Sequence, residues 1–265
     1  MTDGPVTLSI EDGLARLTLN RPEAGNALTP DLAKALLAAA LSCRNDPAVR
    51  AVLMTGTGKN FCVGGDLRTF HGAGDGLYAM MMETTTYLHA ACSHLARMDA
   101  PLVIAVQGAA AGAGISIALL GDLVYAADSA FFCMAYTAAG LSPDGGSTFL
   151  LPRVVGLRRA QELTLTNRRL TAAEAVDWGL ATKAVPDDEL LAAAEAQARA
   201  LAKGPTRAYG RARRLLIGSF ENTYETQMEA ESAAIAASGS EPDGQAGIKA
   251  FLNKEKPVFK GGITA

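Results

Sequence analysis

The sequence is poor in the residues that build metal centres and disulfide frameworks. Its 265 residues include four cysteines, three histidines and one tryptophan. The cysteines, at positions 43, 62, 92 and 133, show no CxxC spacing, and the histidines are scattered. We therefore expect buried free thiols and no metal site. A formal net charge of −3 gives no reason to expect a nucleic-acid partner.

Long uninterrupted hydrophobic runs are also missing. No apolar stretch reaches the roughly 18 residues that span a bilayer, because glycines and Gln107 interrupt the most apolar segment, 101–127. The N-terminus has no basic and apolar signal pattern, so we expect a cytoplasmic protein without a membrane partner. Apolar residues are abundant, at 49%, which is enough for a large buried core.

The N-terminal half alternates between strand-like and helix-like patterns. Two alternating runs around Asp12-Gly13 predict a β-hairpin over 6–22. Thr29 followed by Pro30 predicts the start of a helix. Further patterns predict strands over 48–56, 101–108, 123–128 and 130–134, and helices over 77–98 and 112–122. This alternation indicates an α/β core.

The pattern becomes helical from about residue 157. Helices are predicted over 158–166, 171–179, 187–203, 205–217 and 221–238. We therefore divide the chain into a core domain, 1–199, and a helical C-terminal region, 200–265. The basic cluster Arg211–Arg214 and the acidic stretch 221–231 are expected to form solvated faces or to contact a neighbouring subunit. Without interleaved aromatic residues they do not favour a nucleic-acid surface.

Two segments, 51–67 and 101–120, have the same design. Each is an apolar strand that leads into a glycine-rich turn and then into a helical stretch. Such turns expose backbone N–H groups, and the following helix adds the positive end of its dipole. Two such turns side by side would aim two donors at one oxygen atom, which is an oxyanion hole. From spacing alone, turns that bind nothing remain the alternative.

Five motifs carry a resemblance to a known family. They are "RPEAGNAL" (21–28), "FCVGGDL" (61–67), "VQGAAAGAGISIALLGD" (106–122), "GLSPDGGSTFLLPRVVG" (140–156) and "LTAAEAVDWGLATKAV" (170–185). In this order they resemble the crotonase superfamily, the enoyl-CoA hydratase/isomerase family. The resemblance implies an α/β crotonase (ClpP-like) fold of repeated ββα units with a helical C-terminal trimerisation region. It also implies an acyl-CoA substrate, no cofactor apart from the CoA of that substrate, and a homotrimer or a dimer of trimers.

The same resemblance implies roles for individual residues. By position, the N–H groups of Val63 and Ala113 are the expected oxyanion donors. His89 and Tyr136 are expected near the acyl pocket. The residues expected to contact CoA are Arg21, Ala24, Ala27, Cys62, Gly64, Gly65, Asp66, Leu67 and, from a tail that reaches a neighbouring subunit, Phe259 and Lys260.

The acidic residues favour one reaction of the family. Hydratases of the family resemble one another in using two glutamates, but Ser116 stands at the first position and the second falls in "CMAYTAAG", which has no acid. Asp144 remains, in a motif most similar to the isomerases of ring-epoxidised phenylacetyl-CoA. A single carboxylate suits isomerisation, because it can remove a proton from one carbon and return it to another.

Other reactions stay open at this point. Enoyl-CoA hydration is the main alternative. Asp144 could instead attack an electrophilic carbon, as in the 4-halobenzoyl-CoA dehalogenases of the family, and His89 and Tyr136 lie near positions where those enzymes keep a histidine and a tryptophan. A non-catalytic acyl-CoA-binding or RNA-binding relative is a further possibility, although a pI of about 5.7 disfavours RNA.

Overall fold

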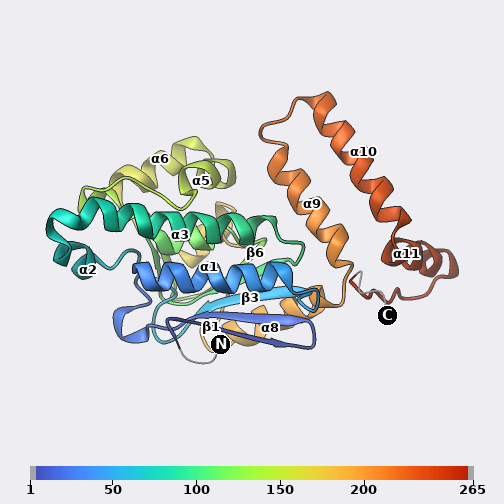
Figure 1. Ribbon diagram of the computed structural model, residues 1–265, viewed down its shortest axis with the longest axis horizontal. Coiled ribbons are helices and arrows are strands. Elements are labelled where there is room, and N and C mark those ends of the chain that lie inside the picture. The colour runs from blue at the N-terminus through green and yellow to red at the C-terminus, as the bar shows by residue number, and fades with distance from the viewer. Residues whose placement is uncertain (1–3, 262–265) are drawn as a thin grey trace.

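The computed structural model describes residues 4–261, which form two β-sheets surrounded by helices (Figure 1). The large sheet has the strand order β1-β2-β3-β4-β6-β9. Its strands are β1 (Val6–Glu11), β2 (Leu14–Leu19), β3 (Ala51–Gly56), β4 (Leu102–Val106), β6 (Leu123–Ala127) and β9 (Lys183–Val185). A small sheet contains β5 (Ala109–Ala111), β7 (Phe131–Cys133) and β8 (Leu170–Thr171). The predicted mixed α/β class is confirmed.

Eleven α-helices are described. They are α1 (Pro30–Asn45), α2 (Leu67–Gly72), α3 (Leu77–Arg97), α4 (Ala113–Ala118), α5 (Ser147–Val155), α6 (Leu157–Thr166), α7 (Ala172–Asp177), α8 (Leu190–Ala202), α9 (Thr206–Gly218), α10 (Tyr224–Ser240) and α11 (Pro242–Asn253). The helices up to α8 surround the sheets, whereas α9, α10 and α11 lead away from them. Helix α1 lies beside α3, and α8 packs against β3 and β4 (Figure 1). None of these helices is both long and apolar enough to cross a membrane.

Local sequence signals explain the first elements. Asp12 and Gly13 both have positive φ angles, 50° and 80°, and Glu11 pairs directly with Leu14 across the predicted hairpin. A two-residue turn with positive φ at both central residues has a backbone twist that matches the twist of the two flanking strands. Thr29 accepts a hydrogen bond from the backbone N–H of Leu32 and thereby caps α1. The remaining strands of the large sheet run parallel to one another, as helical crossovers require.

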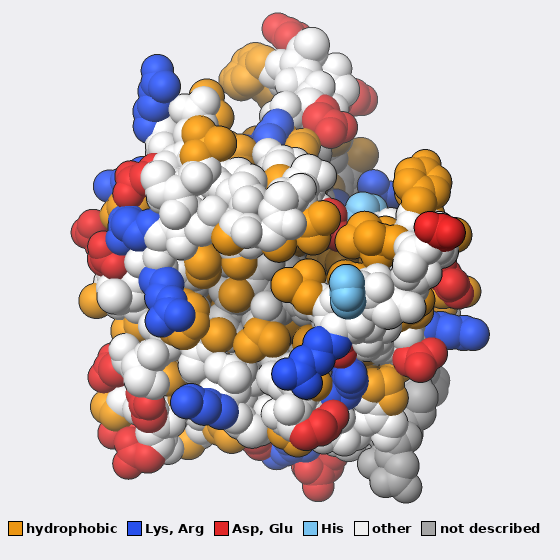
Figure 2. Space-filling model, turned by 90° about the vertical axis from the view of Figure 1, so that its left-hand side faces the viewer, with side chains coloured by type: hydrophobic (Ala, Val, Ile, Leu, Met, Phe, Trp, Pro, Cys, Tyr) orange, Lys and Arg blue, Asp and Glu red, His pale blue; other side chains and the backbone are white. Residues whose placement is uncertain are grey.

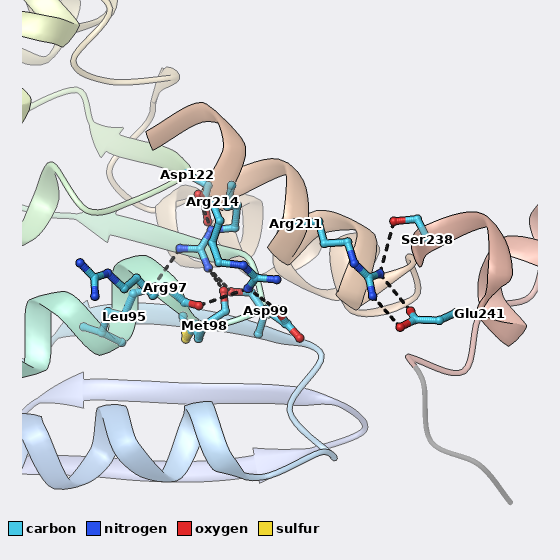
Figure 3. Close-up of polar contacts among 11 residues, drawn as sticks. Leu95, Arg97, Met98, Asp99, Asp122, Arg211, Arg214, Ser238 and Glu241 are labelled. Atoms are coloured by element: carbon cyan, nitrogen blue, oxygen red, sulfur yellow. Dashed lines mark hydrogen bonds and ion pairs between the residues drawn. The ribbon is translucent and has the colours of Figure 1, made fainter. Parts of the chain in front are cut away.

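The C-terminal helices lead away from the core (Figure 1). The expected division at residues 199 and 200 falls inside α8, and α9 is the first helix that leaves the sheets. Arg213 of α9 is 8% exposed and forms an ion pair with Asp122 at 2.7 Å. It also donates to the carbonyl oxygens of Leu95, Met98 and Ala100. These bonds fix α9 to the end of α3, and Figure 3 labels three of the acceptor residues, Leu95, Met98 and Asp122, beside α9.

Candidate active site

A cavity of about 250 Å³ lies where α2, α3, α4 and the segment after β7 meet. Figure 2 faces this end of the molecule, where hydrophobic side chains gather around a hollow. Most of the wall is apolar, and Asp144 is the one carboxylate among the described residues that line it. The lining residues are Leu28, Val63, Gly64, Gly65, Leu67, Phe70, Met81, Thr84, Thr85, Gly112, Ala113, Ala135, Tyr136, Ala139, Leu141, Ser142 and Asp144.

The two glycine-rich turns touch each other at one edge of this cavity. Gly64 has a φ of +103°, and a Cβ atom there would lie 3.0 Å from the carbonyl oxygen of Ala111. Gly112 has a φ of +52°, and its Cβ would lie 3.3 Å from the Cα of Gly64. At Gly65 a Cβ would lie 2.6 Å from the ring of Phe70. Gly64 and Gly112 are therefore required by backbone angle and close approach, and Gly65 by close approach alone.

Two backbone N–H groups on these turns are free of protein partners. Gly64 and Asp66 both bond to the backbone of Leu28, so the N–H of the intervening Gly65 points to the opposite side. Ala113 is the first residue of α4, where a helix leaves its N–H groups unpaired. Neither Gly65 nor Ala113 donates a backbone hydrogen bond within residues 4–261. Both residues line the cavity.

The expectation for Val63 requires a correction. Its N–H donates to the carbonyl oxygen of Gly25 at 3.1 Å. It is therefore occupied within the protein, and the free N–H of this turn lies two residues further along, at Gly65. Sequence position alone did not distinguish these residues, because the pairing with Gly25 joins segments that are 38 residues apart.

The Asp144 carboxylate is held by a row of hydroxyl groups. The Tyr136 hydroxyl donates to Oδ1 of Asp144 at 2.6 Å, and Oγ of Ser116 lies 2.8 Å from the same hydroxyl. Ser116 is fully buried on α4, and Tyr136 follows β7. Burial and the neighbouring Asp144 charge raise the pKa of Tyr136 far above its usual value. Tyr136 is therefore a hydrogen-bond donor throughout the physiological pH range.

His89 approaches the same carboxylate from α3. Its Nε2 atom lies 3.8 Å from Oδ2 of Asp144 and accepts a hydrogen bond from the N–H of Gly145 at 3.1 Å. That bond uses the lone pair of Nε2, so this atom is an acceptor in the contact with Gly145. The side chain is half exposed and does not line the cavity. Oδ2 accepts no hydrogen bond from the described residues, and it is the oxygen of Asp144 left for a ligand.

The segments expected to bind CoA are brought together, but several of their residues have structural tasks. Arg21 donates to the carbonyl oxygen of Ala27 at 2.6 Å and pairs with Asp66 at 3.2 Å. Asp66 caps α2. Burial opposes its charged form, but hydrogen bonds from Thr69 and Arg21 hold the pKa of Asp66 below its usual value. These contacts join the "RPEAGNAL" segment to the "FCVGGDL" loop.

The other expected CoA contacts differ in accessibility. Leu67 is 54% exposed at the cavity rim, and Ala24 is half-buried, whereas Ala27 is buried. Cys62 is fully buried, and its backbone groups bond to Ala109 and Ala111. The structure therefore leaves Cys62 no surface for a ligand, which corrects the expectation for this residue. The cause is again a distant pairing, here between this loop and β5.

Phe259 and Lys260 lie outside the cavity of their own protomer. The N–H of Lys260 donates to Asp243 of α11 at 2.7 Å, and the carbonyl oxygen of Phe259 accepts from Arg50 at 3.2 Å. The described end of the tail is thus attached to α11 and to the core. The expectation that it reaches a neighbouring subunit's CoA stays a prediction.

No group of three or more metal-ligating side chains occurs within residues 4–261. The four cysteines are free and buried, as predicted. Burial raises the pKa of Cys43 and of Cys92 to about 12 and that of Cys62 to about 11. These three thiols are therefore protonated at neutral pH.

Sequence reasoning missed two features of the site. Gly65 was expected only as a CoA contact, although the bonds of its neighbours to Leu28 turn its N–H away from Leu28 and leave it without a protein partner. The bridge from Ser116 to Tyr136 was missed as well. The serine at position 116 was a signal for this bridge, because a buried serine in an apolar helix needs a hydrogen-bond partner.

Comparisons with known proteins match nearly the whole length of the chain. The Enoyl-CoA hydratase/isomerase family matches residues 9–262. The chain is 37% identical to a 1,2-epoxyphenylacetyl-CoA isomerase of Escherichia coli, covering 95% of this chain and 97% of the relative. It is 32% identical to a 4-chlorobenzoyl coenzyme A dehalogenase of an Arthrobacter species, covering 96% and 92%. A solved enoyl-CoA hydratase from Polaromonas superposes with a TM-score of 0.92 at 33% identity, covering 97% of this chain and 100% of that one.

These three relatives are named for three different reactions: an isomerisation, a dehalogenation and a hydration. The fold, the glycine-rich turns and the match over nearly the full length agree with one another. The chain belongs to the enoyl-CoA hydratase/isomerase family and has the crotonase fold.

Proposed function

We propose that this protein isomerises an enoyl-CoA by moving a proton with Asp144. The observation that carries the proposal is the composition of the cavity wall. It combines two free backbone N–H groups with one carboxylate among its described lining residues. The described residues of that wall include no second acid, which the addition of water would require. Ser116 occupies the sequence position expected for one, and its hydroxyl is hydrogen-bonded to Tyr136.

In this proposal the free N–H groups of Gly65 and Ala113 bind the thioester carbonyl oxygen. Oδ2 of Asp144 removes a proton from the carbon next to the carbonyl of a 3-enoyl-CoA. The electron pair moves onto the carbonyl oxygen, where the two donors stabilise the resulting dienolate. Asp144 then returns the proton to the far carbon of the dienolate, which gives the conjugated 2-enoyl-CoA.

The CoA portion supplies binding energy that fixes the acyl group beside Asp144. We assign its contacts to the joined segments 21–28 and 63–67, at whose rim Leu67 is exposed. No cofactor beyond the CoA of the substrate is part of the proposal. The proposed assembly is a homotrimer or a dimer of trimers built through α9, α10 and α11.

Two substrates test the proposal with the wild-type protein. A 3-enoyl-CoA is followed for the appearance of the conjugated product, and crotonyl-CoA is followed for the loss of conjugation by hydration. The proposal predicts that isomerisation is at least about 100-fold faster in kcat/KM, because no second acid is in place to help a water molecule attack. Faster hydration than isomerisation would overturn it.

Dehalogenation is a further candidate after hydration, because two 32% identical relatives are 4-chlorobenzoyl coenzyme A dehalogenases. There Asp144 would attack the halogen-bearing carbon directly, and water would release the product. Chloride release from 4-chlorobenzoyl-CoA distinguishes dehalogenation from the proposed isomerisation. We expect none above the uncatalysed rate.

A further inference from the structure

We propose that Ser116 and Tyr136 act together as a positioning device that holds one oxygen of Asp144 and presents the other to the substrate. The inference rests on the proposed isomerisation. Its basis is the row of contacts from Ser116 Oγ to Tyr136 Oη at 2.8 Å and from Tyr136 Oη to Asp144 Oδ1 at 2.6 Å.

The direction of these hydrogen bonds follows from counting protons. A tyrosine hydroxyl has one hydrogen, and Tyr136 gives it to the carboxylate. Ser116 must therefore be the donor to Tyr136, with the carbonyl oxygen of Gly112 at 3.3 Å as its alternative acceptor. Both hydroxyls consequently orient toward the carboxylate, and the oxygen that remains open is Oδ2.

The packing around the pair fixes its position. Ser116 is fully buried, and a Cβ on Gly145 would lie only 2.8 Å from the Cβ of Ser116. The backbone that carries Asp144 therefore rests directly on α4, the helix whose first N–H faces the cavity. This contact ties the base to the donor Ala113 through one short helix.

The titratable groups that face Asp144 come from two parts of the chain. Tyr136 lies after β7, whereas His89 and Cys92 lie on α3. Nε2 of His89 already accepts a bond from Gly145, and Cys92 is protonated, so Tyr136 is the group that donates a hydrogen bond to the carboxylate directly. Hydrogen bonding to the charged form favours that form. Loss of the Tyr136 hydroxyl therefore makes the carboxylate easier to protonate.

The test is a pH–rate profile of the full-length protein with a 3-enoyl-CoA. Tyr136→Phe is expected to lower kcat about 10- to 100-fold and to move the acidic limb of the profile to higher pH. Ser116→Ala is expected to act in the same direction but more weakly. In the double variant Ser116→Ala adds nothing further, because it acts through the missing hydroxyl. Tyr125→Phe, which removes another buried tyrosine hydroxyl, serves as the control.

A second readout keeps this inference separate from the proposed reaction. The ¹³C carboxyl signal of Asp144, assigned by its loss in Asp144→Asn, is titrated in the wild type and in Tyr136→Phe. Its midpoint is expected to rise in the variant even if the wild type does not isomerise the substrate, in which case the proposed reaction alone fails. An unmoved midpoint, or additive effects of the two substitutions, would overturn the positioning role.

Discussion

Ala113 is proposed to act through its backbone N–H, which has no hydrogen-bond partner among the described residues. It is the first residue of α4, where proline is well tolerated because the N–H has no helical partner. Ala113→Pro therefore removes the donor at little cost to the helix. We expect kcat/KM for isomerisation to fall about 10²- to 10³-fold. Ala113→Gly, which keeps the N–H, should stay within a few-fold of the wild type.

Residue by residue, the sequence located cavity-lining residues better than it identified the free backbone N–H groups. Asp144 and Ala113 were found by position within motifs, and both line the cavity. Val63 and Cys62 were misassigned, because their backbone groups are used in pairings with Gly25, Ala109 and Ala111. Such pairings depend on how distant turns pack, and no local pattern of side chains encodes them.

At the scale of elements, strong local signals were reliable and short strands were not. The hairpin of β1 and β2 and the capped start of α1 both follow from turn and capping residues. Strand β5 was missed because its three residues are all alanine, which has no strand preference of its own. It exists because it pairs with β7 and with Cys62.

The junction between α9 and the core depends on one buried arginine. Arg213→Met removes the guanidinium donor from Oδ1 of Asp122 and from three carbonyl oxygens, and we expect a loss of about 3 kcal/mol in the free energy of unfolding. Arg214→Met, one residue further along, breaks an exposed pair with Asp99 and should cost under about 1 kcal/mol. Urea unfolding of both variants at equal protein concentration measures the difference, and equal losses would contradict the account.

At the scale of the whole molecule, the C-terminal helices expose many large apolar side chains. Helix α10 has no buried residue in the described chain. The exposed apolar side chains of this region include Leu216, Phe220, Tyr224, Met228, Ile235, Ile248, Phe251 and Leu252. Exposed patches of this kind mark interaction sites, which supports the proposed trimer.

Light scattering coupled to gel filtration tests the assembly. We expect a mass of three or six times the 27.4 kDa protomer. Ile235→Glu, at a side chain that is 74% exposed, should shift the protein toward the monomer, because burying a carboxylate in an apolar interface is unfavourable. Leu191→Glu on α8, at a side chain that is 55% exposed, is the control and should leave the mass unchanged. A wild-type protein of monomer mass would contradict the proposal.

The most direct test of the central claim compares the wild type with Asp144→Asn on a 3-enoyl-CoA, with binding of a saturated acyl-CoA measured by calorimetry. If one carboxylate carries the proton, kcat falls by about 10²- to 10⁴-fold, while the dissociation constant of the saturated acyl-CoA stays within a few-fold. Isomerisation by Asp144→Asn within tenfold of the wild-type rate would show that another group moves the proton.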